Sequence, residues 1–310
     1  MINTVLGKIS PSKMGNTSVH EHMSGAMLKT ASEHLPKERE YVVGELIKAK
    51  QAGLDTIIEV SQCPPVEPAH ILAIAKRSPV NIVISTGFYC FWSDEQKEYT
   101  TDQFLEHILY EAANGIGGTG IMPGVIKIAS YRPILLPCEV RALTAAGRAQ
   151  KITGLPMCVH SSTGARYQQY LIEAAGANME KVYFSHLESP TDRENRTPQM
   201  QIDYMLSIME RGSYVSLNGF CYPDYIDPDY MGEMVRQTVE AGYIHKLMLS
   251  LDGWWQYRDG GEQWFVNEDA RKRSYPFLMT EVVPYLKDNG VSDEDVDTML
   301  RKNPAELFGG

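Results

Sequence analysis

The sequence predicts an α/β protein in which eight parallel strands and the helices between them close into a (β/α)8 barrel of the TIM type. Eight short runs rich in β-branched or apolar residues recur along the 310 residues. Segments with helical periodicity separate these runs, and several of them end at a glycine, as helices often do. No G-x-G-x-x-G motif follows any of the runs, and eight repeats over this length favour a closed barrel over an open sheet.

The predicted strands are short and almost wholly apolar, as is typical of strands covered on both faces. They span residues 17–19, 56–60, 81–85, 124–128, 156–159, 182–185, 214–217 and 247–251. The predicted helices between them span residues 38–52, 67–76, 101–114, 138–153, 167–175, 199–211 and 229–241. We expect the first eleven residues to form a hairpin or lid at the bottom of the barrel, and residues 274–289 and 292–301 to be closing helices. Barrels of this kind use about 250 residues as one domain, so a single domain over residues 1–310 is expected.

The composition excludes several classes of partner. The chain has 29 Lys and Arg residues against 39 Asp and Glu residues and no basic block, which argues against nucleic acid as a partner. Its five cysteines form no C-x-x-C pair, so neither a disulfide framework nor a thiolate zinc site is indicated. No charged leader pattern and no apolar stretch of about 18 residues occurs. We therefore expect a cytoplasmic protein with a small-molecule substrate and no membrane partner.

The end of the first predicted strand carries the sequence His20-Glu21-His22. Side chains alternate along a strand, so the two histidines point the same way and Glu21 points oppositely. This spacing differs from the helical H-E-x-x-H pattern of metalloproteases. By itself the pair indicates either a metal site or two hydrogen-bonded histidines.

Other residues of types that can act as metal ligands lie in or just after other predicted strands. Lys127 lies in the fourth strand, His160 and His186 follow the fifth and sixth, and Asp252 follows the eighth. Each alone has a structural interpretation, such as a buried histidine or a turn aspartate. In a (β/α)8 barrel, however, the carboxyl ends of all strands surround one site, so these side chains converge with the histidine pair.

The context of these residues resembles that of a known family. The segments are T-S-V-H-E-H, G-V-I-K-I-A, C-V-H-S, F-S-H-L-E and L-S-L-D-G-W, followed by N-P-A-E-L-F near the end of the chain. In this order they resemble the phosphotriesterase family of the amidohydrolase superfamily, and the resemblance covers essentially the whole chain. It implies a (β/α)8 barrel with a binuclear metal centre at the C-terminal face of the strands, in a protein that forms a homodimer.

The resemblance also implies how the metal ligands divide. His20, His22 and Asp252 would hold the more buried ion, and His160 and His186 the more exposed one. Imidazole and carboxylate ligands suit zinc, which is the expected ion, with manganese, cobalt and iron as alternatives.

Lys127 would bridge both ions as a carbamate. An ammonium group beside two dications would be repelled, whereas the neutral amine can add CO₂ and then supplies an anionic oxygen to each ion. The cofactors implied are therefore two divalent ions and the CO₂ that forms this carbamate.

The chemistry implied is hydrolysis by a metal-bridging hydroxide, with Asp252 as the catalytic residue that takes the proton during attack. Tyr89 matches a position where lactonases of the family place a tyrosine over the metals. We therefore expect the protein to open a lactone, for example a sugar lactone, or to cleave a carboxylic ester. The alternatives are a phosphotriester or organophosphate hydrolase and an N-acyl amide hydrolase. A non-catalytic binding protein is disfavoured because all six ligands are present.

Substrate recognition is less constrained by pattern. Asn218 and Gly219 stand where lactonases of acyl-homoserine lactones in the family have an Asp-Arg pair, which disfavours those substrates. Arg132, Arg166 and Arg258 all follow strands and are candidates for an anion contact; Arg166 is favoured because it lies six residues beyond His160. Trp254, two residues after Asp252, is predicted to form an apolar wall of the substrate pocket.

Overall fold

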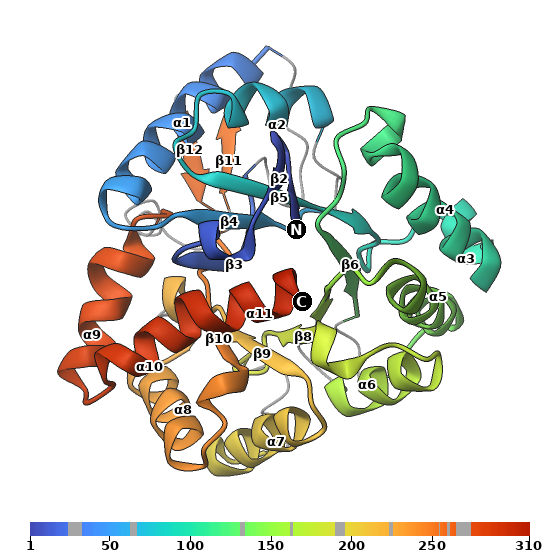
Figure 1. Cartoon of the computed structure of the whole chain (residues 1–310). Helices are drawn as coiled ribbons and strands as arrows, with labels where there is room; N and C mark the ends of the chain where they lie inside the picture. Colours follow the sequence, from blue (N-terminus) through green and yellow to red (C-terminus); the bar gives the residue numbers. More distant parts are fainter. Residues whose placement is uncertain are drawn as a thin grey trace.

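Eight parallel strands form one sheet that curls into a nearly closed barrel, and helices surround it (Figure 1). This computed structural model describes residues 1–23, 33–62, 67–130, 134–161, 164–189, 196–222, 226–253, 255–258, 261–264 and 274–310. The sheet runs in the order β10-β9-β8-β7-β6-β5-β4-β3, so each strand pairs with its neighbour in the chain. The predicted fold class is therefore confirmed.

The eight barrel strands are three to seven residues long. They are β3 (Thr17–Glu21), β4 (Thr56–Glu59), β5 (Asn81–Gly87), β6 (Val125–Ala129), β7 (Met157–His160), β8 (Val182–Ser185), β9 (Tyr214–Leu217) and β10 (Leu247–Leu249). Seven parallel pairings join them. All eight coincide with runs expected from the sequence to within a few residues.

The outer layer contains the helices predicted between the strands. They are α1 (Leu35–Gln51), α2 (Pro68–Ala75), α4 (Thr101–Asn114), α5 (Pro137–Thr153), α6 (Ala165–Ala174), α7 (Pro198–Glu210) and α8 (Pro228–Glu240). Proline near the start of α1, α2, α5, α7 and α8 costs no helical hydrogen bond there. The side chain of Thr100 caps α4 by accepting from the backbone N–H of Gln103.

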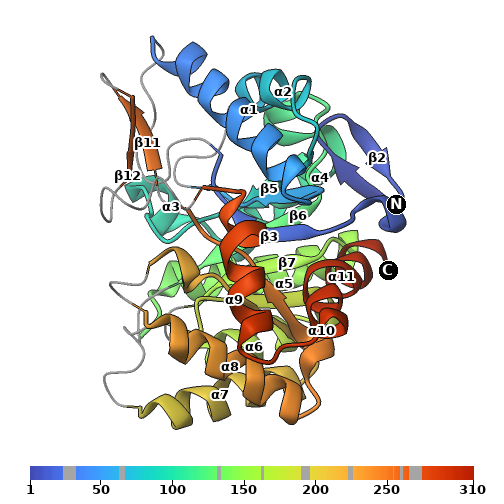
Figure 2. The same ribbon diagram turned by 90° about the vertical axis from the view of Figure 1, so that its left-hand side faces the viewer.

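Elements outside the repeat close the bottom of the barrel. β1 (Ile2–Thr4) and β2 (Gly7–Ile9) form the expected hairpin, and Val5 N donates to Ile82 O at the start of β5. The chain ends with α9 (Val283–Asp288), α10 (Asp293–Asp297) and α11 (Asn303–Gly309); one π-helical turn precedes α9 and another joins α10 to α11. Figure 2 shows both termini at one end of the barrel.

Two long connections between barrel strands and helices contain secondary structure of their own. The segment after β5 contains the short helix α3 (Asp94–Glu98), and the segment after β10 contains a hairpin of β11 (Trp255–Arg258) and β12 (Gly261–Trp264). In Figure 2 this hairpin lies at the end opposite the termini. We call that end, where the carboxyl ends of β3 to β10 lie, the mouth.

The core has two parts. A large apolar cluster separates the sheet from the helices, whereas a smaller one fills the interior of the barrel. The interior cluster includes Val19, Tyr183, Tyr214 and Met248 from the strands, with Leu307 and Phe308 of α11 packed against them. Apolar side chains thus fill the bottom of the interior, and polar side chains occupy its mouth. No helix in the described part of the chain is long and apolar enough to cross a membrane.

The junction of β5 and β6 requires a glycine. Gly87 has a φ of +120°, and a Cβ there would lie 2.0 Å from the backbone oxygen of Lys127. We expect Gly87→Ala to lower the free energy of unfolding by about 3 kcal/mol, because it combines backbone strain with a steric overlap. Urea unfolding measures this change.

The matched control is Gly44→Ala, in the middle of α1, where a Cβ meets nothing within 4 Å. This change should raise the stability by about 0.4–1 kcal/mol. Equal effects of the two substitutions would contradict the close approach of β5 and β6.

Candidate metal centre

Two histidines reach the barrel interior from β3. The pairing of β3 with β4 shifts in register between Ser18 and Glu21, an irregularity of the kind that redirects side chains beside active sites. Val19 lies in the interior cluster, and yet the next residue, His20, also faces inward: its Nε2 is 3.2 Å from Nζ of Lys127. His22 reaches the same space two residues later, as the alternation predicts.

Asp252 joins these two histidines from the other edge of the sheet. Its Oδ1 lies 2.8 Å from Nε2 of His22 and 3.4 Å from Nε2 of His20. Ligand atoms of the three residues all lie within 4.8 Å of one another, and all three residues are buried. Two imidazoles and one carboxylate in this arrangement match the donors of a divalent transition metal ion.

The other three predicted ligands lie around this group. The rings of His160 and His186 have centroids 4.1 Å apart, and the ring of His186 is 4.8 Å from that of His20. Nδ1 of His186 lies 3.7 Å from Oδ2 of Asp252. Lys127 is fully buried in the interior. The structure therefore brings all six residues together.

His186 offers a direct test of whether the residues suit a metal. Its Nε2 is buried and has no hydrogen-bond partner in the part of the chain that the structure describes. Buried polar atoms rarely lack a partner, so this nitrogen has room for a ligand. The donor set and this free nitrogen both fit a bound ion.

Two of these residues hold unusual backbone conformations. Among the described residues other than glycine, only His186 and Asp252 have a positive φ, at 70° and 55°. Ser185 points into the barrel toward His20, so simple alternation would direct His186 outward. The left-handed conformation turns its side chain back toward the interior. Such conformations are costly and occur preferentially at functional sites.

Two serines orient the histidines of β3. Oγ of Ser185 lies 2.8 Å from Nδ1 of His20, and Oγ of Ser61 lies 2.7 Å from Nδ1 of His22. Both rings therefore keep Nε2 for the centre, as metal-binding histidines with an outer hydrogen bond do. These serines were not predicted from the sequence. Their position near strand ends could have indicated them, since Ser61 follows β4 closely and Ser185 directly precedes His186.

The electrostatics favour the protonation states that metal ligands need. Burial lowers the pKa of His20 and His160 well below the usual value, and nearby positive charge adds to this effect. Burial also lowers the pKa of His186, to about 4. Burial raises the pKa of Asp252, but its histidine neighbours outweigh this and leave it below the usual value. These histidines are thus neutral and Asp252 is ionised.

His22 behaves differently from the other histidines. Burial lowers its pKa, but the hydrogen bond and charge of Asp252 outweigh burial and raise it. The contact with Asp252 therefore favours the protonated form of the His22 imidazole. A bound ion would replace that proton, because metal ligands must be deprotonated.

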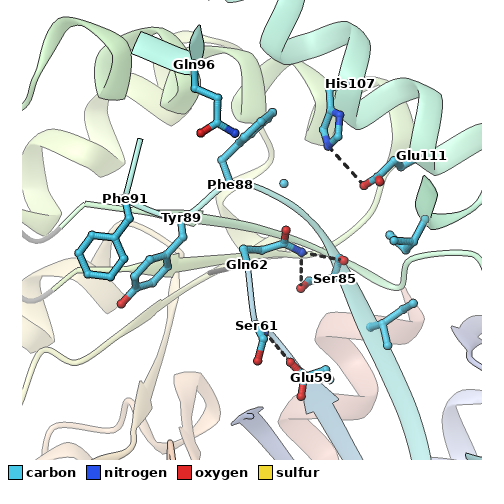
Figure 3. A pocket seen from close by; sticks show the side chains of 13 residues that line it. Glu59, Ser61, Gln62, Ser85, Phe88, Tyr89, Phe91, Gln96, His107 and Glu111 are labelled. Atoms are coloured by element: carbon cyan, nitrogen blue, oxygen red, sulfur yellow. Dashed lines mark hydrogen bonds and ion pairs between the residues drawn. The ribbon is translucent and has the colours of Figure 1, made fainter. Parts of the chain in front are cut away.

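A pocket of about 270 Å³ opens beside the centre, between the ends of β4 and β5 and helices α3 and α4. Figure 3 shows its polar lining, where Gln62 donates to Ser85 and His107 faces Glu111. Tyr89 and Ser61 also line it. The ring centroid of Tyr89 lies 5.4 Å from that of His160, so this residue links the pocket to the centre, as its predicted role requires.

Of the other residues predicted to contact substrate, the structure describes the side-chain contacts of Arg166 alone. Arg166 begins α6, and its guanidinium donates to the backbone oxygen of Ser207 on α7 at 3.0 Å. The structure thus uses this side chain between two helices and does not bring it to the six ligands. Trp254 and Arg132 lie outside the described residues, and Arg258 is described only as part of β11.

The serine beneath His20 provides a test of the centre. We expect Ser185→Ala to weaken metal binding by about 10- to 100-fold, because His20 loses the hydrogen bond that fixes its ring. Titration against a competing chelator measures this affinity. Ser213→Ala is the control, because this buried serine accepts from Gln169 and touches none of the six ligands. Unchanged affinity in Ser185→Ala would contradict the orienting role.

Comparison with known proteins places the chain in one family. The model of the family described as "Phosphotriesterase family" matches residues 1–308. The phosphotriesterase homology protein of Mycobacterium tuberculosis is 29% identical, over 99% of this chain and 97% of that protein. An aryldialkylphosphatase of Saccharolobus solfataricus is 26% identical, over 97% and 96% of the two chains. An N-acetyltaurine hydrolase of Rattus norvegicus is also 26% identical, over 98% and 97%.

A solved structure shares the same fold. It comes from the molecular engineering of organophosphate hydrolysis activity from a weak promiscuous lactonase template. The two chains match over their whole lengths with a TM-score of 0.87 and 22% identity. This likeness supports the barrel architecture.

Proposed function

This chain belongs to the phosphotriesterase family and is a metal-dependent hydrolase, and we propose that it opens a lactone or cleaves a carboxylic ester. The observation that carries the hydrolytic chemistry is the convergence of His20, His22 and Asp252 within 4.8 Å of one another. The position of Tyr89, whose ring meets that of His160 edge to face, supports a carbonyl substrate.

Two divalent ions, zinc in the first instance, complete the proposed centre. When bound, they lower the pKa of a water molecule and polarise the oxygen of the substrate. His20, His22 and Asp252 would hold one ion, and His160 and His186 the other.

Lys127 is the proposed bridge between them, as a carbamate. Its Nζ has Nε2 of His20 at 3.2 Å and Sγ of Cys158 at 3.5 Å, and no ion pair of this lysine with a carboxylate occurs among the described residues. An unpaired ammonium is costly in such a buried place. An anionic carbamate between two cations removes this cost.

Asp252 is the proposed proton acceptor. Its Oδ1 is engaged by His22 at 2.8 Å, whereas its Oδ2 lies farther from its partner within the described part of the chain, Nδ1 of His186 at 3.7 Å. Oδ2 is therefore the atom placed to receive the proton of the attacking water and to pass it to the leaving group. The left-handed backbone of Asp252 fixes the direction of this carboxylate.

Two other substrates remain as alternatives within the same chemistry. The similarity to an N-acetyltaurine hydrolase favours an N-acyl amide, and the similarity to an aryldialkylphosphatase favours a phosphotriester. Hydrolysis of either substrate needs an activated water and a polarised oxygen, so the metal centre does not distinguish these substrates from a lactone or ester. The residues around the mouth would make that distinction.

The proposal is tested by measuring the metal content of the purified protein together with a hydrolysis screen. The screen covers sugar lactones, acyl lactones, aryl esters, N-acyl amino acids and aryl phosphotriesters. We expect about two metal ions per chain and the highest kcat/KM on a lactone or ester. Two ions with activity only on amides or phosphotriesters would replace the substrate class. A chain without metal after growth in supplemented medium would overturn the proposal.

The role of Asp252 generates a separate prediction. Asp252→Asn should keep the fold and lower kcat by about 10²- to 10⁴-fold, because an amide cannot accept the proton. Circular dichroism and steady-state kinetics measure the two effects. Asp102→Asn is the control, because that carboxylate is exposed on α4 and pairs only weakly with Arg148 at 3.4 Å. An unchanged kcat in Asp252→Asn would rule out this role.

A further inference from the structure

A buried amide stands at the end of β9, among the proposed metal ligands. Asn218 directly follows this strand, and its neighbours in the sheet are β8, which leads into His186, and β10, which leads to Asp252. Tyr214 and Ser216 of β9 face the barrel interior, so alternation places Asn218 on the same face, one step nearer the mouth. Asn218 is only 1% exposed.

The side-chain oxygen of this amide contacts two serine hydroxyls. Oγ of Ser216 donates to Oδ1 of Asn218 at 2.6 Å, and Oγ of Ser250 donates to the same oxygen. Because Ser216 lies deeper along β9 and Ser250 directly follows β10, the oxygen is held between them. The NH₂ group must therefore point away from both serines.

The NH₂ group itself is unsatisfied. Nδ2 of Asn218 is buried and has no hydrogen-bond partner among the residues that the structure describes. A buried donor without an acceptor is costly, and such groups in native proteins call for an explanation. A ligand that supplies an acceptor atom is the explanation that fits a residue between His186 and Asp252.

The backbone around Asn218 is held as firmly as its side chain. Its N–H donates to Oε1 of Glu188 at 2.8 Å. Gly219 makes this approach possible, because a Cβ there would lie 3.2 Å from Cγ of Glu188 and 2.5 Å from Cδ1 of Ile226. The donor is thus fixed before any substrate binds, which is what effective stabilisation of developing charge requires.

We propose that Nδ2 of Asn218 donates a hydrogen bond to the carbonyl or phosphoryl oxygen of the substrate. This inference rests on the proposed function, since the acceptor is the oxygen that gains negative charge during hydrolysis. It narrows the substrates to those with a strongly accepting C=O or P=O oxygen, as opposed to C=S or P=S. It also gives a physical role to the position where this chain departs from the Asp-Arg pair of the family's acyl-homoserine lactonases.

Asn218→Ala and Asn218→Asp test the proposal on matched substrates. The probes are diethyl 4-nitrophenyl phosphate and its P=S analogue, with the best aryl ester from the screen as a third substrate. Loss of the donor should lower kcat/KM for the P=O substrate and the ester by about 10²- to 10³-fold. The fall for the P=S substrate should be at least tenfold smaller, because sulfur accepts hydrogen bonds weakly.

Asn218→Asp keeps the shape of the side chain and removes the donor, so it should lose at least as much activity as Asn218→Ala. Asn114→Asp is the control, because this exposed residue only donates to Tyr110 O within α4. Metal content measured in every variant separates loss of substrate contact from loss of the ions. Equal falls for P=O and P=S substrates, or no fall in either, would overturn the proposal.

A binding measurement tests the donor without turnover. The metal-loaded wild type and Asn218→Ala are titrated with diethyl phosphate in a calorimeter, and the variant should bind about tenfold more weakly. Equal affinities would contradict the hydrogen bond. If the wild type carries metals but hydrolyses none of the screened compounds, the proposed function fails, whereas this comparison still decides the role of Asn218.

Discussion

The contact between the first and last strands of the barrel is the constraint on which the site depends. The backbone N–H of Asp252 donates to His20 O at 3.1 Å, and the N–H of Leu251 donates to Oε1 of Glu21 at 3.0 Å. These bonds join the two edges of the sheet at the mouth. They bring together residues from opposite ends of the chain, so the ligand set exists only when the barrel is closed. Folding and assembly of the centre are therefore one event.

Closure of the barrel does not by itself direct every candidate ligand toward the site. His186 and Asp252 adopt left-handed backbone conformations, and the register of β3 shifts between Ser18 and Glu21. Each departure costs stability that the surrounding barrel must supply. The serines beside His20 and His22 then determine which ring nitrogen faces the centre. The site is thus the part of the fold in which the backbone departs from its preferred local conformation, as expected of a functional site.

The sequence predicted the strands and the convergence of the six candidate ligands because both follow from simple periodicity and from the topology of a parallel barrel; that the six bind metal stays a prediction. His186 was predicted from its position after a strand. Side-chain alternation after Ser185 would direct it outward, and the positive φ that turns it inward cannot be read from the sequence. Ser61 and Ser185 were missed because a serine near a strand end has many other uses. For Arg166, the position near His160 in the chain did not reveal that its guanidinium would bond to Ser207 on α7, and its contact with a substrate stays a prediction.

The metal centre and the residues around it answer different questions. A centre of the proposed kind would supply an activated water and a polarised oxygen to any electrophile that reaches it, so it would serve esters, amides and phosphotriesters alike. Selection among them must come from groups that contact the rest of the substrate. The structure offers two such regions: the pocket that Tyr89 links to His160, and the amide of Asn218 between β8 and β10. In our proposal the pocket would select by size and polarity, whereas the amide donor would select by the accepting strength of one oxygen.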